Sequence, residues 1–219
     1  MMSSKTVTVE TFPSGPLSTN TYLLSTKSGK GAIIDAAPGC TAAVQRAVEA
    51  KGVEVEAILL THSHWDHIAE TSEIKRLFPV PVFIHSEDRA NLESPGSDGI
   101  PSLHRTAIVG VIPDRILNGG ERFPVGDLLV EVIHSPGHSP GLVCYYIRSE
   151  GILFCGDLFF RGSIGTLALP TSESDRMWPS LKRIATLPAE TRVFPGHGKA
   201  TTIGAEGWLA RAKELYGFS

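Results

Sequence analysis

The sequence contains few cysteines, no long hydrophobic run and no excess of basic residues. Its 219 residues include three cysteines, an odd number without a Cys-x-x-Cys pair, which argues against a disulfide framework and is typical of a reducing compartment. No apolar run approaches the roughly 18 residues of a membrane-spanning helix, and the N-terminus lacks the apolar block of a signal peptide. We therefore expect a cytoplasmic protein with no membrane contact.

The charge balance is slightly acidic and includes no long basic stretch. The net charge is −3 at pH 7, which argues against a dedicated nucleic-acid-binding protein. Hydrophobic residues make up 42% of the chain, enough for a substantial core. Because no linker divides the sequence, we expect one domain over residues 1–219.

The first half of the chain alternates between predicted strands and predicted helices. Alternating or continuous apolar residues predict strands at 6–11, 21–26, 31–35, 55–60 and 82–84. Helices are predicted at 41–51, with Thr41 as the N-cap, at 67–78, which Pro79 ends, and at 86–92. This alternation indicates an α/β architecture in which the nearly all-apolar strands are buried and parallel.

The second half begins with an irregular region and then returns to strands and helices. Residues 94–114 open with a segment rich in Pro and Gly; a mobile loop over a site and a simple surface excursion are both open interpretations. Strands are predicted at 128–134, 141–147, 151–156 and 191–194, and helices at 174–187 and 205–216. The chain is thus expected to form two halves, each of strands followed by helix.

Residues 61–67, Thr-His-Ser-His-Trp-Asp-His, place three histidines and an aspartate directly after an apolar strand. His62 and His64 are two residues apart, so both imidazoles point to one side of an extended segment. A strand-to-helix turn would bring Asp66 and His67 to the same central space. Nitrogen and oxygen donors so close together suit a borderline transition metal such as zinc. The alternative is a solvated polar turn in which Asp66 only caps the next helix.

Three further candidate donors follow predicted strands, each directly after a glycine. His138 lies in the Pro- and Gly-framed turn 135–141, and Asp157 and His197 each end a strand. Glycine allows unusual backbone angles and close approach at such points. Each residue alone could be an ordinary turn residue, whereas together with the first cluster they favour a site with more than four ligands.

These motifs, in this order and over nearly the whole chain, resemble the metallo-β-lactamase superfamily, and most closely its short glyoxalase II-like (hydroxyacylglutathione hydrolase-like) branch. The similar stretches are His-x-His-x-Asp-His at 62–67, Asn-Thr-Tyr-Leu-Leu at 20–24, Ser-Pro-Gly-His-Ser-Pro-Gly at 135–141, Gly-Asp-Leu-Phe-Phe at 156–160 and Gly-His-Gly-Lys at 196–199. The resemblance implies an α/β fold, a four-layer αβ/βα sandwich of two mixed sheets flanked by helices.

The resemblance also implies two divalent metal ions, with zinc expected and iron or manganese as alternatives. The implied ligands are His62, His64 and His138 for one ion, Asp66, His67 and His197 for the other, and Asp157 as a bridge between them. His85, His104 and His134 match no ligand position and are interpreted as ordinary core or surface residues. Cys155 is interpreted as a core thiol, because a buried thiol packs like a small hydrophobic group.

The implied activity is hydrolysis of a small-molecule thioester or a related acyl substrate. A hydroxide shared by the two ions would attack the acyl carbon, and Asp66 would orient it and accept its proton. Lactone hydrolysis is a variant of this chemistry. The alternative is a persulfide dioxygenase-like oxidoreductase that uses one iron, since such enzymes share these motifs. Nuclease activity would need a basic patch, and a non-catalytic scaffold would show a lost ligand; the sequence shows neither.

Two departures from the family pattern concern the substrate. Thr166 stands where the family places Arg or Lys after the glycine matched by Gly165, and apolar residues follow at 167–169. The sequence ends soon after His197, without the helical extension that helps to hold glutathione in typical glyoxalase II. We therefore expect a pocket wall more apolar than the family norm, and both departures argue against specificity for a glutathione thioester.

Overall fold

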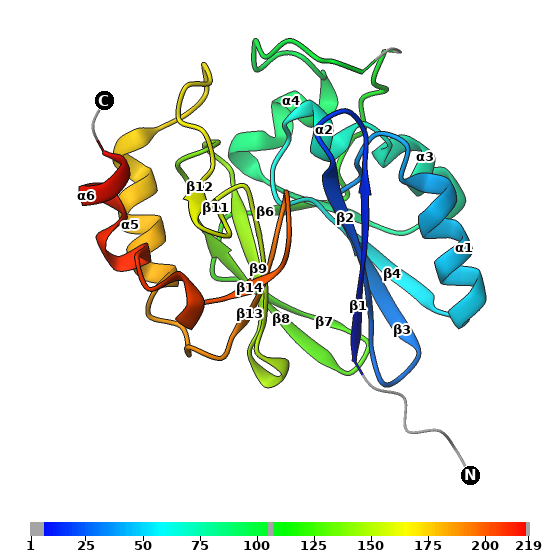
Figure 1. Ribbon diagram of the computed structural model, residues 1–219. Coiled ribbons are helices and arrows are strands. Elements are labelled where there is room, and N and C mark those ends of the chain that lie inside the picture. The colour runs from blue at the N-terminus through cyan, green and yellow to red at the C-terminus, as the bar shows by residue number, and fades with distance from the viewer. Residues whose placement is uncertain (1–6, 105–106, 218–219) are drawn as a thin grey trace.

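Two six-stranded sheets face each other in the computed structural model, which describes residues 7–104 and 107–217 (Figure 1). The strands of the first sheet, in spatial order, are β1 (Thr8–Ser14), β2 (Thr19–Ser25), β3 (Lys30–Ile34), β4 (Glu54–Leu59), β5 (Val82–His85) and β6 (Arg115–Leu117). Those of the second sheet are β14 (Thr201–Thr202), β13 (Arg192–Pro195), β10 (Ile152–Gly156), β9 (Val143–Ile147), β8 (Leu128–His134) and β7 (Arg122–Val125). A small hairpin joins β11 (Phe159–Phe160) to β12 (Ser163–Ile164).

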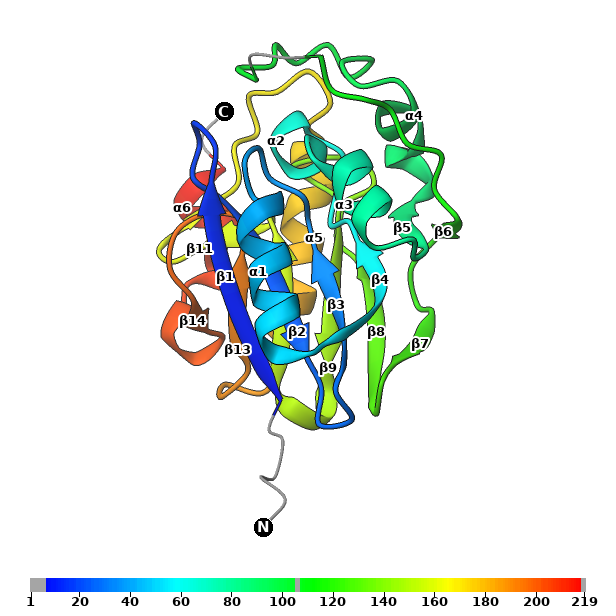
Figure 2. The same ribbon diagram turned by 90° about the vertical axis from the view of Figure 1, so that its right-hand side faces the viewer.

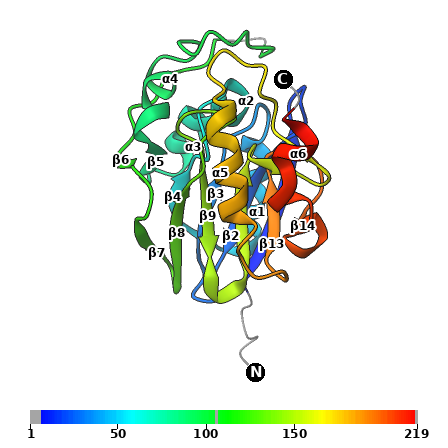
Figure 3. The same cartoon turned by 90° about the vertical axis from the view of Figure 1, so that its left-hand side faces the viewer.

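Helices cover the outer face of each sheet. The first sheet carries α1 (Thr41–Lys51), α2 (Trp65–Ile68), α3 (Thr71–Leu77) and α4 (Arg89–Glu93) on its side of the molecule, and Figure 2 shows α1 and α3 in front of its strands. The second sheet carries α5 (Ser174–Ile184) and α6 (Ala212–Tyr216), which face the viewer in Figure 3. The order helix, sheet, sheet, helix confirms the predicted four-layer αβ/βα sandwich with mixed sheets.

Both faces of the central strands are buried, which explains their nearly continuous apolar sequences. Leu24 in β2 faces the core between the sheets, and Leu23 beside it faces the helices. Tyr145 and Tyr146 in β9 divide in the same way between the inner core and the core under α5. Because successive side chains of a strand point to opposite faces, each central strand contributes to two cores. Among the described residues, no helix is long and apolar enough to cross a bilayer.

The parallel strands place several of their carboxyl ends at one edge of the sandwich. Strands β3 to β6 are parallel in the first sheet, and β10 is parallel to β13 in the second. The carboxyl ends of parallel strands meet at the same edge of a sheet, where open α/β sheets hold their ligands. This edge lies opposite the N-terminus in Figure 1, and the loops after β4, β8, β10 and β13 gather there.

The predicted helix 67–78 is wrong as a single element, because α2 ends at Ile68 and α3 starts at Thr71. The backbone N–H of Ala36 donates to the carbonyl of His67, and the N–H of Glu70 donates to the carbonyl of Ala36. These two bonds to a neighbouring loop replace the bonds that would continue the helix. A tertiary contact therefore overrides the local helical pattern.

Two further helix predictions also need correction. Cys40 occupies the N-cap position of α1, and the Thr41 hydroxyl donates instead to the Glu70 carboxylate (2.5 Å). The predicted helix 205–216 is two 3₁₀ turns, Gly204–Glu206 and Leu209–Arg211, followed by the short α6. The buried Glu206 carboxylate accepts bonds there from Thr201 and Trp208, which holds the chain away from a continuous helix.

The strand ends differ from the prediction at a few places. β1 continues through Ser14, so the turn before β2 is later than expected, and residue 6 lies outside the described residues. The short edge strands β6, β7 and β14 were not predicted. Between 94 and 114, the described residues contain no helix or strand, in agreement with the predicted irregular region. Whether this loop moves stays a prediction.

Candidate metal centre

The seven predicted ligands come together at the edge where the strand ends meet. The segment after β4 supplies four of them, the turn after β8 supplies His138, and the ends of β10 and β13 supply Asp157 and His197. The set brought together is His62, His64, Asp66, His67, His138, Asp157 and His197. Six are buried, and the His197 side chain is 24% exposed. His62 and His197, the first and last of the set, are 135 positions apart in the sequence (197 minus 62) and yet belong to one cluster.

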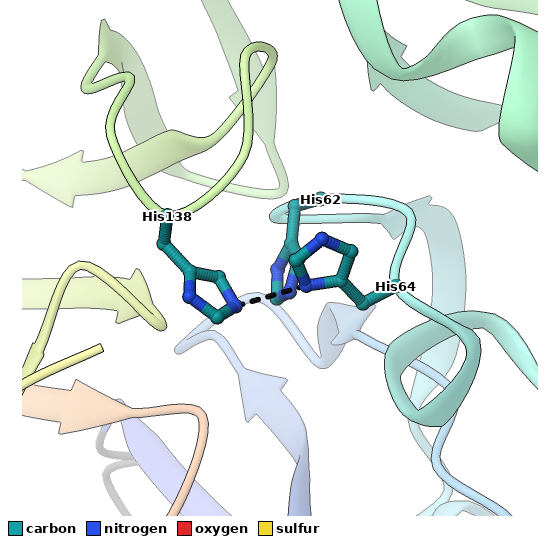
Figure 4. A group of neighbouring side chains, drawn as sticks. All are labelled: His62, His64 and His138. Atoms are coloured by element: carbon teal, nitrogen blue, oxygen red, sulfur yellow. Dashed lines mark hydrogen bonds between the residues drawn. The ribbon is translucent and has the colours of Figure 1, made fainter. Parts of the chain in front are cut away.

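One group consists of His62, His64 and His138 (Figure 4). Their nearest ring nitrogens all lie within 4.8 Å of one another. His64 Nδ1 is 2.9 Å from His138 Nε2, the contact drawn as a dashed line in Figure 4. The figure shows the three rings converging from two loops on a common point. Three imidazole nitrogens at this spacing match the ligand set of a tetrahedral zinc site with one open position.

A second group consists of Asp66, His67 and His197, again with ligand atoms within 4.8 Å of one another. His197 Nε2 and His67 Nε2 lie 3.3 and 3.5 Å from Asp66 Oδ2. Asp157 lies between the two groups. Its Oδ1 is 3.3 Å from His67 Nε2, and its Oδ2 is 3.5 Å from His138 Nε2. One carboxylate therefore reaches both groups, as a bridging ligand must.

Hydrogen bonds outside the cluster fix which ring nitrogen faces its centre. His138 Nδ1 is 2.9 Å from the carbonyl oxygen of Thr166, and His197 Nδ1 is 3.1 Å from that of Leu17. A carbonyl oxygen only accepts, so each Nδ1 carries a hydrogen and each Nε2 is the nitrogen that faces the cluster. His64 is reversed, because its Nδ1 faces His138 while its Nε2 lies 3.4 Å from the Thr171 hydroxyl. Such outer bonds orient imidazole ligands in metal sites.

Three buried polar atoms at the centre have no hydrogen-bond partner within the described residues: His62 Nε2, His67 Nε2 and Asp157 Oδ1. Burying an unpaired polar atom is costly, so such atoms indicate that a partner is missing from the protein alone. All three atoms face the cluster and belong to side chains of the kinds that coordinate metal ions. The donor set therefore fits a divalent cation, and it fits two because the donors form two groups.

Two histidines of the first group, His62 and His64, are poised to remain neutral. Burial lowers the pKa of His62 well below its ordinary value. Burial, assisted by the neighbouring His138, lowers the pKa of His64 to about 3. A neutral imidazole keeps the lone pair that a metal needs. These residues are consequently ready to coordinate at neutral pH without losing a proton.

The second group is held together by charge. Burial opposes the charged form of Asp66, but His67 and His197 hold its pKa at about 2. Burial likewise opposes charge on His197, but Asp157 and Asp66 raise its pKa to about 9. Two buried carboxylates thus require positive charge beside them, which protonated imidazoles supply. A divalent cation would supply that charge in their place.

A glycine makes room for the bridging carboxylate. A Cβ atom on Gly196 would lie 2.0 Å from Asp157 Oδ1 and 2.7 Å from a ring carbon of His67, far inside contact distance. The residue before it, Pro195, is anchored by its carbonyl oxygen, which accepts bonds from the side chains of Asn20 and Tyr22 in β2. The Pro-Gly-His turn is therefore fixed against the first sheet at a spacing that admits only glycine.

Asp35, at the end of β3, is a supporting residue that sequence analysis missed. Its carboxylate accepts bonds from the Thr61 backbone N–H (2.7 Å), the Thr61 hydroxyl (2.8 Å) and His67 Nδ1 (2.9 Å). The Thr61 hydroxyl oxygen also lies 3.1 Å from His62 Nδ1. One buried carboxylate thus orients two predicted ligands. The available signal was an aspartate directly after an all-apolar strand.

Asp88 is a second missed residue, and it joins the two ligand-bearing turns of the first group. Its carboxylate accepts bonds from the Ser63 backbone N–H (2.8 Å), the Ser139 hydroxyl (3.1 Å) and the Gly141 backbone N–H (2.8 Å). Burial raises the pKa of Asp88 despite these donors. Because Ser63 and Ser139 adjoin ligands on different sheets, Asp88 sets the distance between those ligands.

Replacing Asp35 with asparagine should weaken metal binding about 10- to 100-fold, the usual effect of losing a hydrogen-bond partner behind a ligand. Asparagine also tolerates the left-handed backbone of residue 35 (φ 59°), so the fold should be kept. Competition with a chromophoric chelator measures the affinity. Asp127→Asn, at an exposed turn where the carboxylate accepts from the Ser28 N–H, is the matched control. Equal affinities for the two variants would show that Asp35 does not support the ligands.

His85 and His134 form a different kind of group with Glu87. Their rings stack 3.9 Å apart, and the three residues place ligand atoms within 4.8 Å of one another. However, His85 Nδ1 accepts from the Glu87 backbone N–H, His134 Nε2 donates to the Pro140 carbonyl, and Arg176 pairs with the Glu87 carboxylate. His85 Nδ1, His134 Nε2 and the Glu87 carboxylate thus already have protein partners, whereas His85 Nε2 is buried without one among the described residues.

The two remaining residues singled out from the sequence lie apart from the ligand groups. His104 belongs to none of the groups found among the described residues. Cys155 is fully buried and free, with its Sγ 3.3 Å from the carbonyl oxygen of Phe159. Burial raises the pKa of this thiol well above its ordinary value, which agrees with the core role predicted for it.

A cavity of about 500 Å³ opens over the ligands. Its described lining consists of Leu17, His64, Trp65, Asp66, Ile100, His138, Asp157, Phe160, Ser163, Ile164, Thr166, Leu169 and His197. Thr166 and Leu169 belong to the predicted apolar wall, whereas Leu167 packs into the core under α5 instead. Sequence analysis did not identify the other apolar lining residues, which come from the β1–β2 turn, α2, the 94–114 loop and the β11–β12 hairpin.

Comparison with known proteins agrees with this geometry. The sequence matches the family described as Metallo-beta-lactamase superfamily over residues 14–197. The crystal structure of BLEG-1 B3 metallo-beta-lactamase is similar with a TM-score of 0.86 and 33% identity, covering 95% of this chain and 100% of that one. The crystal structure of TTHA1623 in a di-iron-bound form has a TM-score of 0.77 and 36% identity, covering 93% and 98%.

A curated relative with a named activity is the hydroxyacylglutathione hydrolase GloC of Haemophilus influenzae. It is 28% identical over 205 residues, which cover 90% of this chain and 94% of GloC. The family match includes all seven clustered residues, the two-sheet sandwich is the same in the solved structures, and the ligand groups lie at the sheet edge. The chain therefore belongs to the metallo-β-lactamase superfamily of metallo-hydrolases.

Proposed function

We propose that the seven clustered residues hold two divalent cations, zinc foremost, and that the protein hydrolyses a small-molecule thioester or related acyl compound. The observation that carries this proposal is the pair of donor groups joined by Asp157, with buried donor atoms that lack a protein partner. Two cations bound there would lower the pKa of a water between them and polarise the substrate carbonyl. The Metallo-beta-lactamase family match supports hydrolysis as the reaction class.

Asp66 is the proposed proton acceptor for the attacking water. It lines the cavity, and its Oδ2 accepts a bond of 2.6 Å from the Thr19 hydroxyl, which fixes the carboxylate. Burial opposes its charge, but His67 and His197 hold its pKa at about 2, so it stays ionised at neutral pH. An oriented, ionised carboxylate beside the substrate cavity can hold the water and take its proton.

The neighbouring side chains would keep bulk water away from the reacting atoms. Trp65 is buried at the start of α2, and the Phe160 ring meets the His197 ring edge to face at 5.6 Å between centroids. Both line the cavity. Electrostatic interactions strengthen where water is excluded, so these aromatic walls favour stabilisation of charge on the acyl oxygen.

The names of two similar proteins support acyl hydrolysis. GloC is named as a hydroxyacylglutathione hydrolase, and BLEG-1 is titled a metallo-beta-lactamase. TTHA1623 is titled as di-iron-bound, so iron is an alternative to zinc with the same count of two. The oxidoreductase alternative requires one iron per chain. Metal count therefore separates the two candidate functions more directly than metal identity.

Elemental analysis of the purified protein should find about two divalent cations per chain, as two donor groups require. Removal by a chelator should abolish turnover of thioesters, lactones and β-lactams, and zinc, manganese or iron should restore it. Metal-replete protein without activity on any acyl compound would contradict the hydrolase. One iron per chain, with oxygen consumption on a persulfide, would favour the oxidoreductase.

A further inference from the structure

Apart from the ligands, most of the described lining of the cavity is apolar. Six of its described lining residues are hydrophobic: Leu17, Trp65, Ile100, Phe160, Ile164 and Leu169. They come from the β1–β2 turn, α2, the 94–114 loop, the β11–β12 hairpin and the segment before α5. Five separate parts of the chain thus converge on one hydrophobic surface beside the proposed reaction centre.

Two of these apolar residues, Leu17 and Phe160, contact the predicted ligand His197. The Leu17 backbone carbonyl accepts the bond from His197 Nδ1, while the Leu17 side chain is 45% exposed at the cavity mouth. The Phe160 ring packs against the ring of that same histidine. An apolar group seated on Leu17 and Phe160 would therefore lie beside the second ligand group.

Polar groups in the cavity other than the ligands are few. Ser163 and Thr166 are the two hydroxyl residues of the described lining, and that lining includes no lysine or arginine. The Thr166 carbonyl already accepts from His138, and its hydroxyl accepts from the Ala168 backbone N–H. Arg161 lines a separate cavity of about 360 Å³ with Arg192. A carboxylate entering the main cavity would lose hydration without gaining a cationic side chain from its described lining.

We infer that this cavity selects a neutral, hydrocarbon-bearing acyl group, carried on a thioester or lactone carbonyl and free of carboxylates. The inference rests on the proposed hydrolase function and adds the substrate class. The cavity volume of about 500 Å³ lies within the range of small-molecule sites. The hydrocarbon fills the space between Leu17, Phe160 and Leu169, and the carbonyl lies at the ligand cluster.

Matched substrate pairs test the inference. N-acetylcysteamine thioesters with acyl chains from two to eight carbons should show kcat/KM rising about two- to four-fold per methylene, because each methylene leaves water for an apolar wall. For each chain, the glutathione thioester should be at least about ten-fold poorer, because its carboxylates find no lysine or arginine in the described lining. Equal or better turnover of the glutathione thioesters would overturn the inference and leave the hydrolase standing. Lactones that bear alkyl chains of the same lengths show whether the hydrolysed carbonyl belongs to a thioester or to a lactone.

A gain-of-charge variant makes the test sharper. Thr166→Arg places a guanidinium at the cavity wall and should raise kcat/KM for glutathione thioesters about ten-fold, with no gain for the neutral series. The Thr166 backbone carbonyl that orients His138 is kept in this variant. Thr186→Arg, at an exposed threonine just after α5, is the matched control. No gain with Thr166→Arg would count against the missing cation as the basis of selection.

Binding of stable analogues separates the inference from the proposed function. Calorimetry with the thioethers S-octyl-N-acetylcysteamine and S-octylglutathione can be done on both metal-free and metal-loaded protein. The neutral thioether should bind at least about ten-fold more tightly in both states, since the apolar wall belongs to the chain itself. If no acyl compound were turned over, the proposed hydrolase function would be wrong, but this binding preference would still support the selectivity of the cavity. No preference would overturn the selectivity.

Discussion

Asp157→Asn should reduce bound metal from about two cations per chain to one or fewer, and should lower turnover at least about 1,000-fold, which corresponds to about 4 kcal/mol in the activation barrier. The carboxylate of Asp157 reaches His67, His138 and His197 at 3.3 to 3.5 Å, so it touches both donor groups. Asparagine keeps the shape, removes the negative charge and directs N–H groups at nitrogen ligands. Elemental analysis and initial rates on the same preparation provide the two measurements.

Asp114→Asn is the control for this variant. Asp114 pairs with Lys75 at the surface and accepts from the Val82 backbone N–H. Like Asp157, it is therefore an aspartate held by its neighbours, but it lies away from the ligand cluster. It should keep both metal content and turnover. Two bound cations in Asp157→Asn would show that the donor groups do not depend on this carboxylate, and the proposed bridge would then be wrong.

Asp66→Ala should lower kcat about 100- to 10,000-fold, the range for loss of a general base. The first donor group lacks Asp66 and should keep its cation, so activity should fall by more than metal content does. Thr19→Val, which removes the hydroxyl that donates to Asp66, should give a smaller loss of about ten-fold, because the base remains but is no longer held. Measured kcat per bound cation distinguishes the two variants.

Asp175→Ala, at an exposed carboxylate in the first turn of α5, serves as the control and should leave kcat unchanged. Full turnover together with full metal content in Asp66→Ala would refute the proposed role of Asp66. A loss of both in equal proportion would instead assign Asp66 to metal retention alone.

The candidate ligands could be predicted because their signals are local. His62 and His64 lie two positions apart after an apolar strand, and Asp157 and His197 each follow a glycine at a strand end. Parallel strands bring such strand ends to one edge of a sheet. Donors recognised separately along the sequence were therefore expected to lie close together. The four-layer arrangement followed from the two halves and from the resemblance of the motifs.

The supporting residues could not be found in this way, because their partners are distant. Asp35 acts through Thr61 and His67, which lie 26 and 32 positions away in the sequence. The break between α2 and α3 has the same origin, since Ala36 supplies the bonds that interrupt the helix. Short edge strands also lack a pattern long enough to identify. Local periodicity carries no information about such long-range bonds.

The cavity wall was predicted only in part. The residues after Gly165 indicated an apolar lining, and Thr166 and Leu169 do line the cavity. Leu17 and Ile100 were not recognisable, because isolated apolar residues in turns and loops are common on protein surfaces. Their convergence depends on how the β1–β2 turn and the 94–114 loop lie over the ligands.

Each donor group draws its members from both sheets. His62 and His64 follow a strand of the first sheet while His138 follows one of the second, and Asp66 and His67 meet His197 in the same divided way. Neither half of the sandwich contains a complete group. The chemistry is consequently a property of the joined halves, because separating the two sheets would leave each donor group incomplete.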